Sequence, residues 1–310
     1  MKTVVLLAAC RGEKFLPELL DSLVSQTDPD FTVLFQNDGG QDETERILRA
    51  WESRDARFHS GAASGRHLGA AGNFLSLLSQ AEGDLFLFCD QDDLWEKEKV
   101  AELKKAMSSA ASSVSPEMPL LVHSDASVID EEGRLLCPSF FRLQGWDPGA
   151  VTLNRLLVQN NATGCTMIFN RPLAELLRAH ADPSRLFMHD WFAALTAAAF
   201  GEIVFLDRAL TRYRQHDGNA IGASRTSLFR RGFRALHSQK EARKRIALTY
   251  SNARAFLESY GEDMPPEARN TIDSYLRTEA RPKLARIQAV RSMGCVMQSP
   301  VTRLGQIFFG

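Results

Sequence analysis

The sequence predicts an α/β fold: a doubly wound, mostly parallel sheet flanked by helices, with a helical region after it. Apolar runs of strand length alternate with helical patterns over the first two thirds of the chain, as in chains that form such sheets. The run at residues 85–89 is apolar without alternation, which is typical of a strand buried on both faces. From Ser224 onward, arginine-rich helical segments replace this pattern. We therefore expect one domain over residues 1–222 and a second region over residues 223–310.

The first half of the chain is built of strand, turn and helix units. Residues 4–9 are expected to form a buried strand, followed by a helix that tolerates Pro17 in its first turn. A second strand at residues 31–35 leads through a Gly-rich turn into a helix that begins near Asp42. A short third strand and another helix precede residues 85–89. The carboxyl ends of the first two strands and of the strand at residues 85–89 should then converge on one crevice.

The second half continues the alternation, beginning with a helix from Trp95 to Ala110. Strands are expected at residues 120–123, 165–169, 203–206 and 210–215, and helices at residues 153–159, at residues 171–180 and from residue 189 onward. The C-terminal region is expected to hold helices at residues 228–237, 241–258 and 266–291.

Length and composition describe an ordinary globular protein. Of 310 residues, 44% are hydrophobic and 24% are charged, so there is material for a sizeable core. The five cysteines form no Cys-x-x-Cys pair, which argues against a zinc site or a disulfide framework. No apolar run approaches the roughly 20 residues that span a bilayer. We therefore expect a cytoplasmic protein in a reducing compartment.

Charge is distributed unevenly along the chain. Residues 222–310 hold 16 basic and 7 acidic residues, a net charge of +9, whereas residues 1–221 hold 21 and 31, a net charge of −10. Such an asymmetry indicates two segments with different partners. For the basic segment we expect peripheral contact with the inner face of the cytoplasmic membrane. Nucleic acid is not expected as a partner, because Phe229 and Phe233 are spaced like a packing stripe and not interleaved for base stacking.

Three carboxylates, Asp90, Asp92 and Asp93, directly follow the strand expected at residues 85–89. Closely spaced oxygen ligands at the carboxyl end of a strand suit a hard divalent cation, Mg²⁺ or Mn²⁺, which would also relieve the repulsion between them. The alternative is that the acids cap the helix expected near Trp95, because Asp is favoured at helix starts. Three acids together favour the metal site.

The run Asp90-Gln91-Asp92-Asp93-Leu94-Trp95 resembles the Asp-x-Asp motif of GT-A-fold glycosyltransferases of family 2, in particular the rhamnosyltransferase-like members of bacterial polysaccharide assembly. The resemblance covers residues 3–222. It implies the GT-A fold, a Rossmann-like and mostly parallel sheet flanked by helices, with the helical C-terminal region as an appendage. It also implies that Asp90 faces ribose or metal and that Asp92 ligates the metal bridging the donor diphosphate. Asp93 is a second-choice ligand.

Three further segments resemble the nucleotide-binding parts of that family. The turn at residues 8–13 would hold the nucleotide through its backbone near Ala9, and Arg11 would meet phosphate, although Cys10 and Arg11 replace the tyrosine and asparagine usual there. Asp38 would contact the base or ribose of the donor, and a plain tight turn is the alternative. Gly69 and Asn73 match a Gly-x-x-x-Asn-Phe segment beside the nucleotide.

Asp190 falls where family members place the acid that deprotonates the acceptor hydroxyl. His189 is a rival base, and a plain helix N-cap is the alternative role for Asp190. Because Asp190 heads a predicted helix, we expect the helix dipole to lower its pKa and keep it ionised near neutrality.

Two segments complete the expected site. Tyr213-Arg214-Gln215-His216 resembles the Tyr-Arg-x-His that closes these domains, which implies His216 as a metal ligand and Arg214 on phosphate. Satisfied polar packing is the alternative for both. Ser124-Asp125 and Gly164-Cys165-Thr166 are expected to line the acceptor side.

The resulting prediction is an inverting, metal-dependent glycosyltransferase. It would move a hexose, rhamnose-like or galactose- or glucose-like, from a UDP or dTDP sugar to a hydroxyl of a bacterial surface glycan or lipid-linked acceptor. The Gln-x-x-Arg-Trp signature of processive synthases is absent from the sequence, so we expect one sugar per encounter.

Two alternatives remain at this stage. A Mg²⁺-dependent sugar nucleotidyltransferase would share the acids, but it needs a Gly-rich basic loop after the first strand, where only Arg11-Gly12 occurs. A non-catalytic binding protein would use its basic tail to dock nucleic acid, which the helical spacing of Phe229 and Phe233 does not favour.

Overall fold

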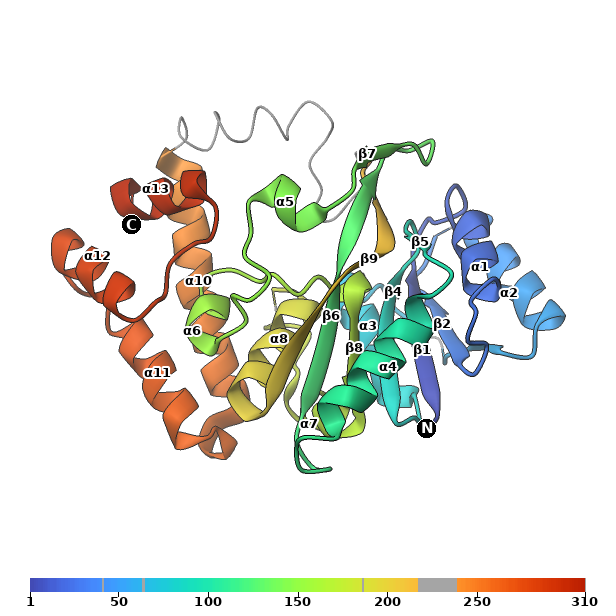
Figure 1. Ribbon diagram of the computed structural model, residues 1–310, viewed down its shortest axis with the longest axis horizontal. Coiled ribbons are helices and arrows are strands. Elements are labelled where there is room, and N and C mark those ends of the chain that lie inside the picture. Colours follow the sequence, from blue (N-terminus) through green and yellow to red (C-terminus); the bar gives the residue numbers. More distant parts are fainter. Residues whose placement is uncertain (41, 63–64, 186, 217–238, 310) are drawn as a thin grey trace.

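The computed structural model describes residues 1–40, 42–62, 65–185, 187–216 and 239–309 (Figure 1). Its centre is one sheet of nine strands in the order β3-β2-β1-β4-β8-β6-β9-β5, with β7 beside β6. The strands are β1 (Thr3–Ala9), β2 (Thr32–Asn37), β3 (Phe58–Ser60), β4 (Leu85–Asp90), β5 (Leu94–Trp95), β6 (Leu120–Ile129), β7 (Leu135–Cys137), β8 (Met167–Asn170) and β9 (Glu202–Arg214).

Most strands of this sheet point the same way. β1 pairs in parallel with β2 and β4, β2 with β3, and β6 with β9. β8 lies between β4 and β6 and is antiparallel to both, which leaves β6 running in the direction of β4. β5 and β7 are antiparallel edge pairings. The predicted fold, a mostly parallel sheet flanked by helices, is therefore confirmed, with β8 as a reversed strand in the middle of it.

Helices cover both faces of the sheet (Figure 1). Those of the first 216 residues are α1 (Leu16–Val24), α2 (Thr44–Arg54), α3 (Gly69–Gln80), α4 (Lys99–Ala111), α5 (Phe140–Gln144), α6 (Leu153–Leu156), the 3-10 turn η1 (Gly164–Thr166), α7 (Arg171–His180) and α8 (His189–Phe200). One core packs α1, α2 and α4 against the sheet, and the other packs α3, α6, α7 and α8 against its opposite face.

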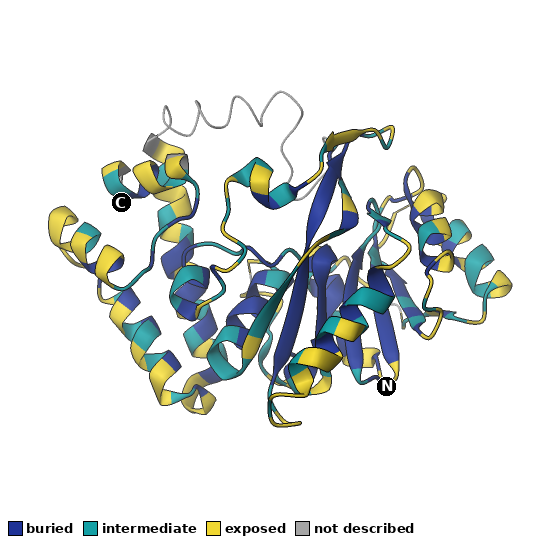
Figure 2. Cartoon of the chain, in the orientation of Figure 1, coloured by how far each residue is buried: buried dark blue, intermediate teal, exposed yellow. Residues whose placement is uncertain are grey.

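Alternate residues of the central strands enter opposite cores, because successive side chains of a strand point to opposite faces. In β4, Leu85 and Leu87 lie in the core under α1 and α4, whereas Phe86 and Phe88 lie in the core under α3 and α8. All four are buried, and Figure 2 shows the central strands as the buried layer of the molecule. The prediction of a strand buried on both faces is confirmed.

The C-terminal helices are α10 (Gln239–Tyr260), α11 (Pro266–Leu276), α12 (Lys283–Ser292) and α13 (Pro300–Phe309), with a short 3-10 turn, η2 (Gly261–Asp263), between the first two. Phe256 of α10 and Ile272 of α11 belong to the same core as α7 and α8. The expected boundary at 222/223 and the expected helix at residues 228–237 lie outside the described residues. The expected single helix over residues 266–291 is wrong: it is divided before Pro282, which cannot continue a helix because it lacks an N–H.

The segment after the acidic run also differs from the expectation. Residues 94–95 form strand β5, which pairs with Arg212 and Thr211 of β9, and the helix begins only at Lys99. The two strands expected at residues 203–206 and 210–215 are one strand, β9, whose pairing with β6 shifts register near Asp125. Within the described residues, no helix is both long enough and apolar enough to cross a bilayer.

Candidate active site

The carboxyl ends of β1, β2 and β4 lie side by side, as the sequence predicted. Ala8 pairs with Asp90 of β4, and Ala9 pairs with Asn37 of β2. The backbone N–H of Asp38 donates to the carbonyl of Ala9 at 2.7 Å, which extends the β1–β2 contact past the last strand residue. The three predicted segments at residues 8–13, 37–40 and 90–93 are therefore brought together at one edge of the sheet.

Gln91 fastens the turn after β1 to the end of β4. Its Oε1 accepts the N–H of Cys10 at 2.7 Å, and its Nε2 donates to the Cys10 carbonyl at 2.8 Å, so the side-chain amide imitates a neighbouring strand. A Cβ on Gly12 would lie 2.2 Å from Gln91 Oε1, so only glycine leaves room for this contact. The role of Gln91 is not predictable from the sequence, because a polar residue inside an acidic motif carries no separate signal.

Asp38, Gly69 and Asn73 hold the start of α3 against β2. The Asp38 carboxylate, which is buried, accepts the N–H of Leu68 through Oδ1 and of Gly69 through Oδ2, each at 2.7 Å. Asn73 Nδ2 donates to the Gln36 carbonyl at 3.2 Å. A helix start fixed in this way suits a bound anion, because helix N-termini carry partial positive charge. The contact of Asp38 with a nucleotide base stays a prediction.

Arg11 is the one non-glycine residue in the described part of the chain with a positive φ, at 52°. A bulky residue in this region is strained, and such strain is concentrated at functional sites. Its side chain is exposed. Desolvation raises the pKa of Asp42, but hydrogen bonds from Thr44 and Glu13 and the positive charge of Arg11 together lower that pKa below its ordinary value. Arg11 therefore presents a positive charge at the end of β1, and its contact with phosphate stays a prediction.

The acidic run forms a cluster at the end of β4. Ligand atoms of Asp90, Asp93 and Cys165 lie within 4.8 Å of one another. Burial, together with the charges of neighbouring acids, raises the pKa of Asp90 well above its ordinary value and that of Asp93 to about 7. The alternative in which these acids cap the next helix is wrong, because α4 begins at Lys99 with Glu98 at its N-cap.

Asp92 and His216 form a pair on the more open side of this cluster. Asp92 Oδ2 lies 2.7 Å from His216 Nε2, and both side chains are partly exposed, at 18% and 16%. The two atoms are hydrogen-bonded to each other, and a carboxylate and an imidazole are both groups that ligate divalent cations. Cys165 fits less well, because thiolates suit softer metals than Mg²⁺. The carboxylates of the acidic run suit a hard cation, and a site that combines Asp92 and His216 with Asp90 or Asp93 stays a prediction.

Arg214 is fully buried beside this pair. Its Nε donates to the Asp92 carbonyl at 2.9 Å, Nη1 to the Glu131 carbonyl at 2.7 Å, and Nη2 to Glu18 Oε2 at 2.6 Å. The guanidinium also stacks over Phe15, 4.7 Å from the ring centroid. It thus ties α1, the acidic run and the turn after β6 together, which matches the polar-packing alternative; its contact with phosphate stays a prediction.

Asp190 lies in the first turn of α8, facing η1. Its Oδ2 accepts the N–H of Gly164 at 3.1 Å, and its Oδ1 accepts the N–H of Trp191 at 2.6 Å. A Cβ on Gly164 would lie 3.3 Å from Asp190 Cβ and 3.1 Å from His189 Nε2, so glycine permits this close approach. The charge of Asp190 is among the causes that raise the pKa of Asp90, which places the two carboxylates near each other.

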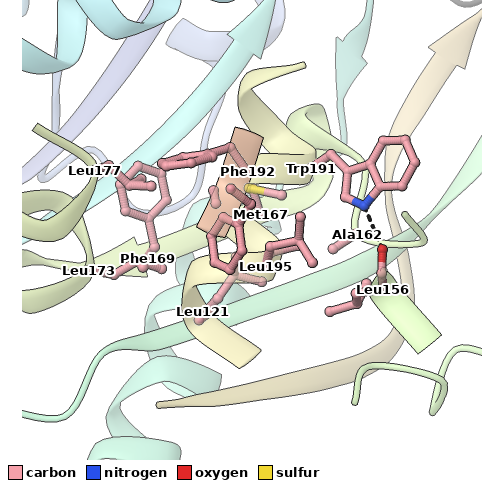
Figure 3. Close-up of a cluster of buried hydrophobic side chains, with 14 of the residues drawn as sticks. Leu121, Leu156, Ala162, Met167, Phe169, Leu173, Leu177, Trp191, Phe192 and Leu195 are labelled. Carbon is pink, nitrogen blue, oxygen red and sulfur yellow. Dashed lines mark hydrogen bonds between the residues drawn. The ribbon is translucent and has the colours of Figure 1, made fainter. Parts of the chain in front are cut away.

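Packing below α8 holds this turn in place (Figure 3). Trp191 donates its Nε1–H to the Leu156 carbonyl at 2.6 Å, and Phe192 and Leu195 lie in the core beside Met167 of β8. The first turn of α8 is therefore anchored from its buried side, while Asp190 is left facing the end of β4.

The expected lowering of the Asp190 pKa is wrong. Burial raises the pKa of this carboxyl to about 6, although the N–H groups of Gly164 and Trp191 act to lower it. Desolvation of the charged form outweighs the helix dipole and the hydrogen bonds. The plain N-cap alternative is also wrong, because Met188 occupies that position.

His189 is buried in an aromatic sandwich. Its ring stacks on Phe74 at 4.1 Å between centroids and meets Phe88 edge-on at 4.7 Å. Burial lowers its pKa to about 3, so the ring is neutral at physiological pH. These contacts favour Asp190 over His189 as the base.

The segments expected on the acceptor side divide in two. Gly164 and Cys165 of η1 lie between the acidic cluster and Asp190, because β8 begins where β4 ends. The Asp125 carboxylate instead holds the start of α5, where it accepts from the backbone of Phe140 and Phe141 and from Ser139 Oγ. The role of Ser124-Asp125 toward an acceptor stays a prediction.

Part of the chain matches a known protein family. The model of glycosyl transferase family 2 matches residues 4–120, which end at the start of β6. A dTDP-rhamnosyl transferase, RfbG, of Shigella flexneri is 25% identical over 228 residues, covering 70% of this chain and 74% of the relative.

Solved structures share the fold over nearly the whole chain. S. aureus TarS residues 1–349, in complex with UDP, superposes with a TM-score of 0.60 at 17% identity and covers 99% of this chain and 88% of its own. A mannosyltransferase, PcManGT, from Pyrobaculum calidifontis in complex with GDP-Man and Mn²⁺ gives a TM-score of 0.51 at 18% identity, covering 98% of this chain and 82% of its own.

The family match favours the glycosyltransferase prediction over a nucleotidyltransferase and over a non-catalytic binding protein. With the acidic run at the end of β4 and the sheet order around it, residues 4–120 belong to glycosyl transferase family 2, and the chain is a glycosyltransferase with the GT-A fold.

Proposed function

We propose that the enzyme is an inverting, metal-dependent glycosyltransferase that transfers a hexose from a nucleoside-diphosphate sugar to a hydroxyl of a bacterial surface glycan. The observation that carries the proposal is the placement of Asp190: a half-buried carboxylate, with its pKa raised to about 6, near the acidic cluster at the end of β4. A base and a diphosphate-binding end at one edge of the sheet are the two parts that direct displacement of a nucleotide requires.

Asp190 serves as the general base in this scheme. A sugar hydroxyl is a weak nucleophile, and a carboxylate within hydrogen-bond reach speeds its attack by roughly 10²–10⁴-fold. A pKa of about 6 leaves most of the carboxyl ionised at neutral pH while making it a stronger base than an ordinary Asp. Attack from the side opposite the leaving diphosphate inverts the anomeric carbon.

Asp92 and His216, with Asp90 or Asp93, would hold Mg²⁺ or Mn²⁺. When bound, the cation neutralises the negative charge of the leaving diphosphate. The chain itself supplies the surroundings: Arg11 at the exposed end of β1, and the start of α3 that Asp38 and Asn73 fix. Together these residues would orient the nucleotide across the ends of β1, β2 and β4.

The relatives support a nucleotide-sugar donor with UDP or dTDP as the carrier. RfbG is named a dTDP-rhamnosyl transferase, and a TarS structure holds UDP-GlcNAc. We infer a rhamnose-like or galactose- or glucose-like hexose, transferred once per encounter. We also retain the division into a catalytic domain, residues 1–222, and an appendage, residues 223–310.

The appendage is proposed to bring the enzyme to the cytoplasmic face of the membrane, where a lipid-linked acceptor would be found. Residues 280–310 contain five basic and no acidic residues. The same segment exposes three large apolar side chains: 83% of Leu284, 41% of Leu304 and 57% of Phe308. Lys283 Nζ donates to the Phe308 carbonyl at 2.5 Å, so the start of α12 and the end of α13 form one face. Exposed apolar groups among cations suit an anionic lipid surface.

Nucleotide binding tests the proposal. UDP, dTDP and GDP should be compared by thermal shift and calorimetry with and without Mn²⁺, because a ligand of the native state raises its stability. We expect UDP or dTDP to bind only with the metal, and Asp92→Asn to lose most of that affinity, since a diphosphate beside carboxylates is repelled without a cation.

Asp207→Asn is the matched control, because Asp207 is an exposed acid on β9 outside the cluster. It should bind nucleotide like the wild type. Metal-independent binding of UDP or dTDP, or full metal-dependent binding by Asp92→Asn, would contradict the metal assignment.

A further inference from the structure

Lys99 is a buried lysine at the first position of α4, and its ammonium is entirely surrounded by protein. Its Nζ donates to the carbonyl of Cys165 at 2.6 Å and to Thr211 Oγ1 at 2.9 Å, and it lies 3.6 Å from the centroid of the Trp95 ring. An ammonium has three N–H donors. The Cys165 carbonyl, the Thr211 hydroxyl and the face of the Trp95 ring therefore account for all three donors.

Burying a positive charge at this position costs free energy. Burial lowers the pKa of Lys99 to about 8, and the start of a helix repels positive charge. Lysine is almost never fully buried unless it is paired. The charges of Asp90 and Asp93 act in favour of the protonated form, but they rank behind desolvation and the nearby cysteines. In the described residues, the hydrogen bonds of Nζ go to the η1 turn and to β9, not to a carboxylate.

The carbonyl to which Lys99 donates belongs to η1, the turn that contacts Asp190, the proposed general base. The Cys165 carbonyl accepts both from Lys99 Nζ and, at 3.0 Å, from Thr211 Oγ1. One residue earlier, the N–H of Gly164 donates to Asp190 Oδ2 at 3.1 Å. The turn is closed by Thr166, whose N–H donates to the Thr163 carbonyl at 2.9 Å. The η1 turn is thus held by hydrogen bonds to the Cys165 carbonyl, and it directs the N–H of Gly164 at the Asp190 carboxylate.

The fold explains why a helix residue can reach this turn. β8 runs antiparallel to β4, so η1, which leads into β8, lies at the end of β4 where the acids are. β9 brings Thr211 to the same place through its pairing with Trp95 of β5. Lys99 follows β5 by four residues and meets both elements from α4.

We propose that Lys99 is a positioning residue for the transfer reaction, which holds the η1 turn and through it orients the Asp190 carboxylate beside the acidic cluster. The inference rests on the proposed role of Asp190 as the base. It makes Lys99 part of the reaction without contact with either substrate, in keeping with its complete burial.

The test compares three variants. Lys99→Met removes the ammonium at similar length, and Thr211→Val removes the hydroxyl donor to Cys165 without any change of charge. Lys104→Met is the matched control: Lys104 lies on the same helix, with its Nζ 2.8 Å from Asp28 Oδ2. The readout is the titration of the Asp190 carboxyl carbon by NMR of protein labelled with carbon-13 in aspartate, with the signal identified by its absence in Asp190→Asn.

We expect the wild-type midpoint near pH 6 and a midpoint about one pH unit higher in Lys99→Met and Thr211→Val, because the N–H of Gly164 no longer supports the charged carboxylate. Lys104→Met should titrate like the wild type. A folded Lys99→Met with an unchanged midpoint overturns the proposal. If Lys99→Met fails to fold, Thr211→Val decides by the same criterion.

Turnover gives a second, independent comparison, measured as release of UDP or dTDP from its sugar nucleotide. If Lys99 acts through Asp190, the double variant Lys99→Met/Asp190→Asn should be no slower than Asp190→Asn alone. Additive losses overturn the proposal. Full turnover by Asp190→Asn would instead contradict the base assignment of the proposed function, and the carboxyl titration would still show whether Lys99 positions Asp190.

Discussion

At the scale of single residues, burial outweighs local electrostatics in this site. The helix dipole and two backbone N–H groups all favour the ionised form of Asp190, yet desolvation raises its pKa to about 6. His189, one residue away, is made neutral by the same effect. Two adjacent titratable groups therefore receive different roles: one near the operating pH, the other an uncharged packing residue.

Asp190→Asn should abolish transfer while sparing the fold and donor binding. The amide keeps the shape and still accepts a hydrogen bond from a backbone N–H, but it cannot take a proton. We expect turnover to fall by roughly 10²–10⁴-fold with nucleotide affinity and melting temperature nearly unchanged. The assignment would be wrong if Asp190→Asn kept near wild-type turnover while His189→Ala, folded, lost it.

The raised pKa of Asp190 also predicts how turnover falls at acid pH. A base must be ionised, and the pKa of Asp190 is raised from about 3.9 to about 6. Turnover should therefore fall tenfold per pH unit below about 6, rather than below about 4 as for an exposed Asp. Rates measured from pH 4.5 to 8 decide it, with circular dichroism as the control for unfolding. An acid limb centred near pH 4 would contradict the raised pKa.

The structure brings the acids and Asp190 together near the end of β4 and places His216 beside Asp92, as expected from the recognisable strand or helix starts next to each. Their roles stay predictions. The sequence did not indicate Lys99 or Gln91. Their roles depend on contacts with Cys165 and Cys10, 66 and 81 residues away, and no local pattern encodes such contacts.

At the scale of elements, the joint between β1 and β4 is fixed by one side chain. Gln91 bonds both backbone groups of Cys10, and Gly12 leaves it the space to do so. The elements around the joint were predictable from apolar periodicity and turn residues. The reversal of β8 and the pairing of β5 with β9 were not, because strand direction depends on partners that are distant in the sequence.

Gly12→Ala should weaken nucleotide binding more than it weakens the fold. The new Cβ would lie 2.2 Å from Gln91 Oε1, so the flexible Gln91 side chain must move and give up two hydrogen bonds. Each is worth about 0.5–1.5 kcal/mol, so a moderate loss of unfolding free energy is expected. Calorimetry should show a larger loss in affinity for UDP or dTDP, because the turn that carries Arg11 is released.

Gly305→Ala provides the comparison for this substitution. Gly305 lies within α13, where a Cβ would be 3.7 Å from its nearest neighbour. It should keep full nucleotide affinity and gain slightly in stability, because alanine favours a helix over glycine. Equal nucleotide affinity in Gly12→Ala and Gly305→Ala would show that the joint does not shape the site.

At the scale of the whole molecule, charge and apolar exposure gather on the C-terminal helices. Arg254 is paired with Glu279, but no acid follows Glu279 in the sequence. A hollow on the first turns of α10 is lined by Lys240, Arg243, Lys244 and Ala247. The arrangement gives the C-terminal helices a basic character that residues 1–221, with a net charge of −10, lack.

The enzyme should bind vesicles of anionic phospholipid in a salt-sensitive way. Each basic side chain near such a surface contributes about 1 kcal/mol. The double variant Leu284→Ser/Phe308→Ser should weaken binding at high salt most strongly, because it removes the apolar part of the contact. Co-sedimentation at low and high salt measures both effects.

Leu135→Ser is the control, because Leu135 is 62% exposed but lies on β7, away from the C-terminal helices. It should bind vesicles like the wild type. Equal binding to neutral and anionic vesicles would contradict the electrostatic part of the proposal, and unchanged binding by the double variant would contradict the apolar part.

The reversed strand β8 pairs with β4 and so joins two parts of the chain, a first cassette (residues 4–120) and a second cassette that follows it. Residues 4–120, which match the family model, supply Arg11, Asp38 and the acids. The segment that follows supplies Cys165, Asp190 and His216, and joins the first cassette across apolar pairs such as Leu87 with Ile168. Recombination between related chains at this seam would therefore replace Asp190 and the part proposed to receive the acceptor, and it would keep Arg11, Asp38 and the acids while changing His216, one of the proposed metal ligands.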